Sequence, residues 1–223
     1  MLAVSQALAD GAPLQLPSAQ PVAPAAAAIA NSAVPPAIAT VDAVTAITRA
    51  NAYFNNTTTL VGDFVQIGAD GTRSEGKLYV QKPGRLRFEY ADPATLEIVA
   101  DGRSVAIRDR KLDTQDLYFI WQTPLKFLLN SKIDLAKDTK VLDVSGNQDS
   151  VSIIVEDSAT LGGTSRIRLV FDPTSFALEQ WSVIDPQGYE TLVSLFNVNT
   201  TTKPDPSLFQ ITYQTGPSDS PYK

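Results

Sequence analysis

The hydrophobic residues of this chain follow a helical period at first and a two-residue period afterwards. From Val41 to Phe54, apolar side chains recur every three or four positions, with alanines between them. That spacing is typical of an amphipathic helix, and Thr40 is a suitable N-cap residue in front of it. The pattern predicts one helix over roughly 41–55.

From position 60 onward, apolar and polar residues alternate in short runs, separated by turn signals such as Pro83-Gly84 and Asp101-Gly102. Such alternation predicts β-strands with one buried face. We expect about ten strands, a flexible loop over 159–165 and a short turn near 206–209. The strand candidates are residues 60–67, 76–81, 85–90, 96–100, 104–108, 113–120, 139–144, 151–157, 166–172, 177–185 and 189–199.

The strand pattern is interrupted once, where Thr123-Pro124 offers an N-cap and a first helical residue. An apolar stripe at helical spacing follows, formed by Leu125, Leu128, Leu129 and Ile133. Sequential strands with short turns pair antiparallel, and a sheet of this size tends to curl. The chain is therefore predicted to be mainly β: an unclosed half-barrel whose concave face is covered by helices. A two-sheet sandwich is the alternative.

Composition removes several kinds of chemistry. The 223 residues include no Cys and no His, and 18 Lys+Arg face 24 Asp+Glu, for a net charge of −6. Disulfides, thiolate nucleophiles and cysteine metal sites are excluded, and the commonest general base is missing. The acidic balance argues against a nucleic-acid partner. No apolar run is long enough to span a bilayer.

The first 40 residues differ from the rest of the chain, because they carry one charge, Asp10, and no aromatic residue. Residues 1–9 resemble the end of a signal peptide, with the small-x-small pattern Ala7-Leu8-Ala9; the alternative is a further Ala-rich disordered stretch. Residues 10–39 are predicted to be a disordered Ala/Pro-rich linker. The working domain is then 40–212, followed by a polar tail at 213–223.

Candidate chemistry is sparse. The usual catalytic motifs are absent from the sequence. Asp109, Asp113 and Asp116 are interpreted as a solvated rim, with a weak cation site as the alternative. Glu89 and Glu97 allow the hypothesis of a glycosidase pair, although the alternation places Glu89 on a solvent-facing side. We expect no enzyme, no metal and no cofactor.

Five stretches of this sequence together resemble the LolA-like outer-membrane lipoprotein carriers, which are periplasmic lipoprotein chaperones. They are residues 60–66, 76–90, 98–102, 123–129 and 181–188. The resemblance covers roughly 41–210. It implies an unclosed antiparallel barrel of about eleven strands, covered by helices, around an apolar cavity that takes the acyl chains of a lipoprotein.

The resemblance also implies roles for residues. Those expected to line the acyl-chain cavity are Phe64, Leu78, Val80, Leu86, Phe88, Tyr90, Ile98, Val105, Ile107, Leu117, Leu169 and Trp181. Leu125, Leu128 and Leu129 would be the apolar face of a lid helix. The family commonly has an Arg just before the Pro that this chain has at position 83, tied to lid opening; this chain has Lys82 there, which lacks the planar fork of Arg.

The partners implied by the resemblance are acylated lipoproteins, an inner-membrane ABC-type lipoprotein releasing complex (LolCDE-like) and an outer-membrane acceptor. The protein would be a monomer in the periplasm of a Gram-negative bacterium. The acceptor of this fold is normally itself a lipoprotein with an N-terminal Cys, so the missing Cys favours the soluble carrier. Two alternatives stay open: a carrier of glycolipid or another lipid on the same fold, and a structural β-domain whose core is filled, since periodicity does not distinguish a filled core from a cavity.

Overall fold

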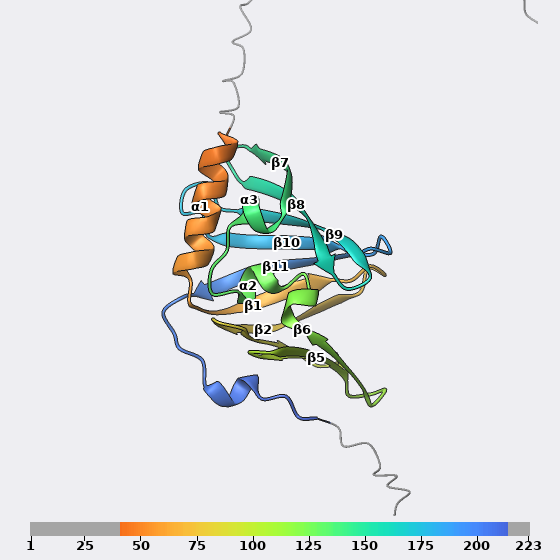
Figure 1. Cartoon of the computed structure of the whole chain (residues 1–223). Coiled ribbons are helices and arrows are strands. Elements are labelled where there is room, and N and C mark those ends of the chain that lie inside the picture. The colour runs from red at the N-terminus through yellow and green to blue at the C-terminus, as the bar shows by residue number, and fades with distance from the viewer. Residues whose placement is uncertain (1–40, 214–223) are drawn as a thin grey trace, which may run out of the picture. The chain divides into compact units, whose positions relative to one another are not determined.

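The computed structural model describes residues 41–213, and the predicted signal-peptide end, the linker and the tail from 214 onward lie outside this range (Figure 1). The described chain begins with helix α1, Ala43–Asn56. Its N-cap is Asp42 rather than Thr40, because the Asp42 carboxylate accepts a hydrogen bond of 2.8 Å from the Thr45 amide. Hydrogen bonds from the hydroxyl and the amide of Thr45 lower the pKa of Asp42.

Eleven strands follow α1 and form one sheet. Every neighbouring pair is antiparallel, and the order is β6-β5-β4-β3-β2-β1-β11-β10-β9-β8-β7. The predicted unclosed half-barrel is therefore confirmed, and the two-sheet sandwich was wrong. The strands are β1 Thr59–Ile67, β2 Arg73–Gln81, β3 Arg85–Tyr90, β4 Leu96–Asp101, β5 Ser104–Asp109, β6 Thr114–Phe119, β7 Lys140–Gly146, β8 Val151–Thr160, β9 Gly163–Phe171, β10 Leu178–Ile184 and β11 Glu190–Asn199.

The edges of the sheet are β6 and β7, which are consecutive in the sequence. The chain that joins them holds three short helices: η1 Ile120–Gln122, α2 Lys126–Leu129 and α3 Leu135–Asp138. Figure 1 shows α2 and α3 in front of the sheet, on the same side as α1. We call residues 120–139 the lid segment. Of residues 41–213, no helix has the length and apolar character that a membrane span requires.

The prediction of one continuous second helix from Thr123-Pro124 was wrong. Residue Asn130 is extended and ends α2 after one turn, and Leu125, not Thr123, is its N-cap. The chain beyond α2 is held by α1, where Asn55 binds both backbone groups of Ile133: its Oδ1 accepts from the Ile133 amide at 2.8 Å and its Nδ2 donates to the Ile133 carbonyl at 2.9 Å. A residue bound in this way does not continue a helix.

The flexible loop predicted over 159–165 was also wrong. β8 and β9 run into a tight hairpin whose two turn residues are Leu161 and Gly162, followed by Gly163. Both glycines have positive φ, +84° and +137°, which side chains other than glycine rarely adopt. The Thr160 and Ser165 hydroxyls, 2.8 Å apart and both buried, join the strand ends below the turn.

The main core lies between the concave face of the sheet and the three α-helices. The convex face of β3 to β5 is covered as well, by the C-terminal segment with the short helix η2, Pro206–Phe209. Phe209, Val99 and Ala106 are buried there, and Arg87 donates to the Leu208 carbonyl at 3.4 Å.

We predict that Asn55→Ala loosens the lid segment. The change removes both hydrogen bonds to Ile133, and leaving partly buried backbone groups unpaired costs about 1–3 kcal/mol. Urea unfolding should show a loss of this order, and hydrogen exchange should become faster at the Ile133 amide. Asn56→Ala is the matched control, because Asn56 is exposed on the same helix turn. Equal exchange in the two variants would contradict this role of Asn55.

Candidate functional site: an apolar cavity beneath the lid segment

A cavity of about 270 Å³ lies between the lid segment and strands β8 and β9. Most of its wall is apolar, and a few polar side chains lie among the apolar ones. The apolar residues are Trp121, Phe127, Ile133, Leu135, Val155, Ala159, Ile167 and Leu169; the polar ones are Lys126, Asn130, Asp138, Thr139 and Asp157.

The floor of the cavity follows from the two-residue period of the strands. On β8, Ile153, Val155 and Asp157 point to the same face, and the register pairs Val155 with Ile167 and Ile153 with Leu169 on β9. Four aliphatic residues and one carboxylate therefore form a continuous inner surface. All five are at most 2% exposed.

The roof of the cavity is the lid helix α2. Phe127 is buried and its ring makes edge-to-face contacts with Phe54 of α1 and Trp181 of β10, both with ring centroids 5.8 Å apart. The Leu129 carbonyl accepts a 2.8 Å hydrogen bond from the Gly84 amide in the β2–β3 turn. These contacts hold α2 through Phe127 to α1 and β10, and through Leu129 to the β2–β3 turn.

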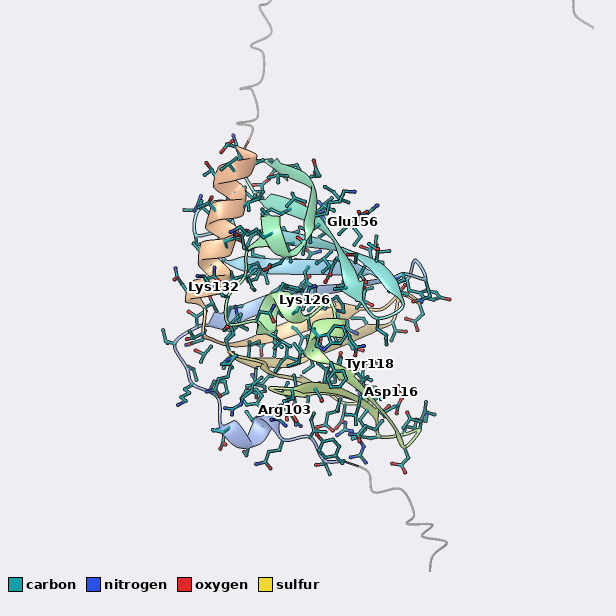
Figure 2. The ribbon with its side chains drawn as sticks, in the orientation of Figure 1. Arg103, Asp116, Tyr118, Lys126, Lys132 and Glu156 are labelled. Carbon is teal, nitrogen blue, oxygen red and sulfur yellow. The ribbon has the colours of Figure 1, made fainter. Side chains whose placement is uncertain are left out.

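A buried ion pair joins the roof to the floor. The Lys126 ammonium on α2 lies 2.7 Å from Oδ1 of Asp157 on β8, and the two side chains are 15% and 1% exposed. Figure 2 shows Lys126 in front of the sheet at α2, and Glu156, the neighbour of Asp157, on β8. The lid is thus tied to the sheet by an ionic contact inside an otherwise apolar space.

Most residues that the sequence assigned to the cavity are buried in the packed core of the described structure. Of the twelve, Leu169 lines the 270 Å³ cavity. Eight others are buried on the concave face in the core: Phe64, Leu78, Val80, Leu86, Phe88, Tyr90, Val105 and Trp181. Ile98 and Ile107 are partly buried against this core. Aromatic contacts fill the space above β1 to β3: the rings of Phe88 and Tyr90 meet Phe64 edge-to-face at 5.0 and 5.1 Å.

The placement of Leu117 on the inner face was wrong. The register pairs Leu117 with Ala106 and pairs Tyr118 with Val105. Since Val105 lies on the concave face, Leu117 lies on the convex one, where it is 48% exposed. If the alternation along a strand is assigned one residue out of step, every side chain is placed on the opposite face of the sheet. β6 is mostly polar, so its sequence does not show which residues face inward.

Of the three expected lid residues, Leu128 and Leu129 are buried and Leu125 packs partly buried against the core. Several lining residues were missed from the sequence, among them Phe127, Lys126 and Asp157. Phe127 was passed over because the expected long helix placed its stripe on 125, 128 and 129. Asp157 continues the alternation Val151, Ile153, Val155 on β8, so the strand period itself could have placed it inside.

The Lys82 ammonium contacts α1. It donates a 2.5 Å hydrogen bond to the Phe54 carbonyl, near the C-terminal end of α1, where helix carbonyls attract cations. Burial lowers the pKa of Lys82 to about 8. The neighbouring Gly84 reaches the lid.

The carboxylates considered for catalysis are engaged elsewhere. Glu97 pairs with Arg87 at 2.8 Å, and Glu89 accepts a 3.2 Å hydrogen bond from the Tyr79 hydroxyl. Asp109 accepts hydrogen bonds from the Thr95 hydroxyl and from the turn amides of Lys111 and Leu112, which lowers its pKa. Within residues 41–213, no three His, Cys, Asp or Glu side chains are grouped to hold a metal ion.

The architecture of the described residues is an unclosed antiparallel half-barrel with a largely apolar cavity beneath a helical segment. Residues 55–212 match the model of one family, described as outer membrane lipoprotein carrier protein LolA. The chain belongs to this LolA family, which confirms the resemblance drawn from the sequence. It is a family of carriers and not of enzymes.

Curated relatives carry the same description. The outer-membrane lipoprotein carrier protein of Ralstonia nicotianae is 30% identical over 171 residues, which cover 69% of this chain and 76% of the relative. That of Methylococcus capsulatus is 25% identical over 177 residues, covering 75% and 84%. Among solved structures, a LolA superfamily protein of Nitrosomonas europaea is similar with a TM-score of 0.43 and 9% identity, over 77% of this chain and 98% of that one.

We predict a pH-dependent contribution of Lys82 to stability. Because the folded pKa of about 8 lies below the ordinary value of 10.5, the unfolded chain binds the extra proton between these two values, and the contribution of Lys82 improves as pH rises through that window. The difference in unfolding free energy between wild type and Lys82→Met should therefore shift in favour of the wild type by on the order of 1 kcal/mol from pH 7 to pH 10. A difference that is constant with pH would contradict the desolvation of this ammonium.

Proposed function

We propose that this protein is a periplasmic lipoprotein carrier that shelters acyl chains in the cavity beneath the lid segment. The observation that carries the proposal is the apolar cavity itself, lined by Phe127, Val155, Ile167 and Leu169, in a chain of the LolA family. In this function the protein takes acylated lipoproteins from an inner-membrane ABC-type releasing complex and delivers them to an outer-membrane acceptor. It acts as a monomer.

Burial of hydrocarbon is sufficient to hold such a ligand. Each methylene removed from water contributes about 0.8 kcal/mol, so a sixteen-carbon chain gains on the order of 10 kcal/mol before ordering costs are subtracted. The contact is non-directional, which suits a carrier that has to release its cargo. No proton transfer is needed, in agreement with a chain without His or Cys.

In this proposal the described structure is the closed state of the carrier. Its cavity of about 270 Å³ is at the lower limit of small-molecule sites, which are roughly 300–1,000 Å³. Several acyl chains therefore require the roof to move away from β8 and β9. The lid segment is suited to this movement because its helices are single turns, and short elements with few backbone hydrogen bonds open at low cost.

The mouth of the cavity has an apolar rim. Trp121 lines the cavity and is 61% exposed, and its ring stacks on that of Phe119 with centroids 6.1 Å apart. Leu161 in the β8–β9 turn is also exposed, and its amide donates to the Gln122 carbonyl at 2.8 Å. An acyl chain that enters between the lid segment and this hairpin would meet apolar surface along its path.

The alternative is a structural domain whose core is completely filled. The cavity above β8 and β9 argues against it, although aromatic rings do fill the space above β1 to β3. A glycolipid cargo would use the same apolar surface. Mass spectrometry of ligands that copurify with the protein distinguishes acylated peptide from glycolipid.

We predict that Leu169→Gln weakens acyl-chain binding about tenfold or more. The change places a polar amide in the apolar floor of the cavity. Loss of the apolar contact between a Leu side chain and the ligand lowers the binding free energy by about 1.5–3 kcal/mol. The measurement is fluorescence titration with a dansyl-labelled palmitoyl peptide. Arg168→Gln is the matched control, since Arg168 is the exposed neighbour on the same strand and should leave binding unchanged.

A second variant, Ala159→Trp, keeps this test independent of folding. Ala159 lines the cavity and is exposed, so a larger side chain blocks the cavity without entering the core, and probe binding should fall. If the wild-type protein binds the palmitoyl peptide without saturation, or both variants bind it as the wild type does, the proposed function is wrong.

We further predict that Phe127→Ala lowers stability while it strengthens probe binding. Loss of the ring removes the contacts to Phe54 and Trp181 and costs about 3–5 kcal/mol. The same change enlarges the cavity and raises the population of the open lid, and apparent affinity rises with the competent fraction. Urea unfolding and titration with the palmitoyl peptide measure the two effects. Weaker binding in a folded Phe127→Ala protein would contradict the role of α2 as a lid.

A further inference from the structure

One polar group in the cavity is not accounted for by the burial of hydrocarbon. Asp157 is 1% exposed at its side chain. Its Oδ1 accepts two hydrogen bonds, from the Lys126 ammonium at 2.7 Å and from the Ala159 amide at 3.0 Å. Its Oδ2 is buried and has no hydrogen-bond partner among residues 41–213.

An acceptor in this position is unusual. An ionised carboxylate accepts at about four lone-pair positions, and buried polar atoms in proteins are nearly always hydrogen-bonded. The side chains around the cavity floor are aliphatic, with Val155, Ile167 and Leu169 beside Asp157. Asp157 is one of the residues that line the cavity, and the apolar part of this lining suits a hydrocarbon chain. The other polar lining residues are Lys126, Asn130, Asp138 and Thr139.

The sign and type of this group select among amphiphiles. A carboxylate oxygen only accepts hydrogen bonds, so it favours a head group with an N–H and repels an anionic one. The nearest cation, Lys126, is already paired with Oδ1 and is not free to attract an anion. The cavity is thus complementary to an acyl or alkyl chain that ends in an amide or an ammonium, and opposed to a free fatty acid.

We propose that Oδ2 of Asp157 is the polar anchor of the cavity and accepts a hydrogen bond from an N–H group attached to the bound hydrocarbon chain. This inference rests on the proposed function and adds to it the head-group chemistry of the ligand. Because Lys126 belongs to the lid helix, displacement of α2 carries the ammonium away from Asp157. When the lid opens, the Lys126 ammonium no longer donates to Asp157, and an N–H group of the ligand donates to the carboxylate in its place.

The test uses four probes with the same twelve-carbon chain: N-methyl dodecanamide, dodecylammonium, methyl dodecanoate and dodecanoate. Each displaces Nile red, a neutral dye without an N–H, from the full chain below its micelle concentration. The amide or the ammonium should bind about tenfold more tightly than the methyl ester, and dodecanoate should bind most weakly. Preference for the ammonium alone assigns a free amine as the head group, and preference for the amide assigns an N-acyl group.

The double variant Lys126→Met, Asp157→Leu replaces the ion pair with apolar side chains of similar size, a type of exchange that buried pairs often tolerate. In this variant the ester should bind as tightly as the amide and the ammonium. Glu156→Gln is the matched control, because Glu156 is the neighbour on β8 that pairs outward with Lys140 and Arg166; it should keep the wild-type order of affinities.

Three results would overturn the anchor. They are equal binding of ester, amide and ammonium by the wild type, retention of the N–H preference by the double variant, and tightest binding of dodecanoate. In each of these cases saturable binding of the chains leaves the proposed function intact. Failure of all four probes to displace Nile red would remove both the anchor and the proposed function.

Discussion

The two free edges of the sheet belong to consecutive strands, β6 and β7, and the chain between them has to cross from one edge to the other. The concave face is apolar and has to be covered, while the convex face of β3 to β5 already lies under the C-terminal segment. The lid segment is therefore a consequence of the topology. A cover made from a connection, rather than from a long helix, is also the part of the core that can move most easily.

The core is packed unevenly along the sheet, and this determines where a ligand can be held. Above β1 to β3, Phe64, Phe88 and Tyr90 fill the space with edge-to-face contacts. Below the lid, the inner residues Val155, Ile167 and Leu169 of β8 and β9 are aliphatic and shorter, and the rings that line the cavity there, Phe127 and Trp121, come from the lid segment. Phe171, farther along β9, packs on Phe54 of α1. A cavity results at the end of the sheet where the side chains do not reach the roof. Opening of the lid extends this existing space instead of creating one in a dense interior.

The sequence predicted the half-barrel well because most of its strands are separated by clear turn signals, and antiparallel order follows from short turns. It predicted the site poorly for two physical reasons. Alternation identifies which side chains face inward. Whether two inward side chains touch or leave a cavity depends on the sizes of residues that are far apart in the chain, such as Phe127 and Leu169, which line the same cavity. The lid depends on side-chain contacts to a distant helix: α2 ends at Leu129, and Asn55 of α1 binds both backbone groups of Ile133, which no pattern within 120–139 indicates.

The contact between Lys126 and Asp157 links the lid to the cavity floor in a way that packing alone does not. A buried ion pair is a poor source of net stability, because desolvation offsets much of the attraction, yet breaking it leaves an unpaired carboxylate that is strongly unfavourable in an apolar site. In the proposed carrier, an empty open lid exposes hydrocarbon to water and takes away the ammonium that pairs with Asp157. In that proposal a ligand that supplies both a hydrocarbon chain and an N–H donor replaces both contacts, so Lys126 and Asp157 would couple the opening of the lid to the cargo.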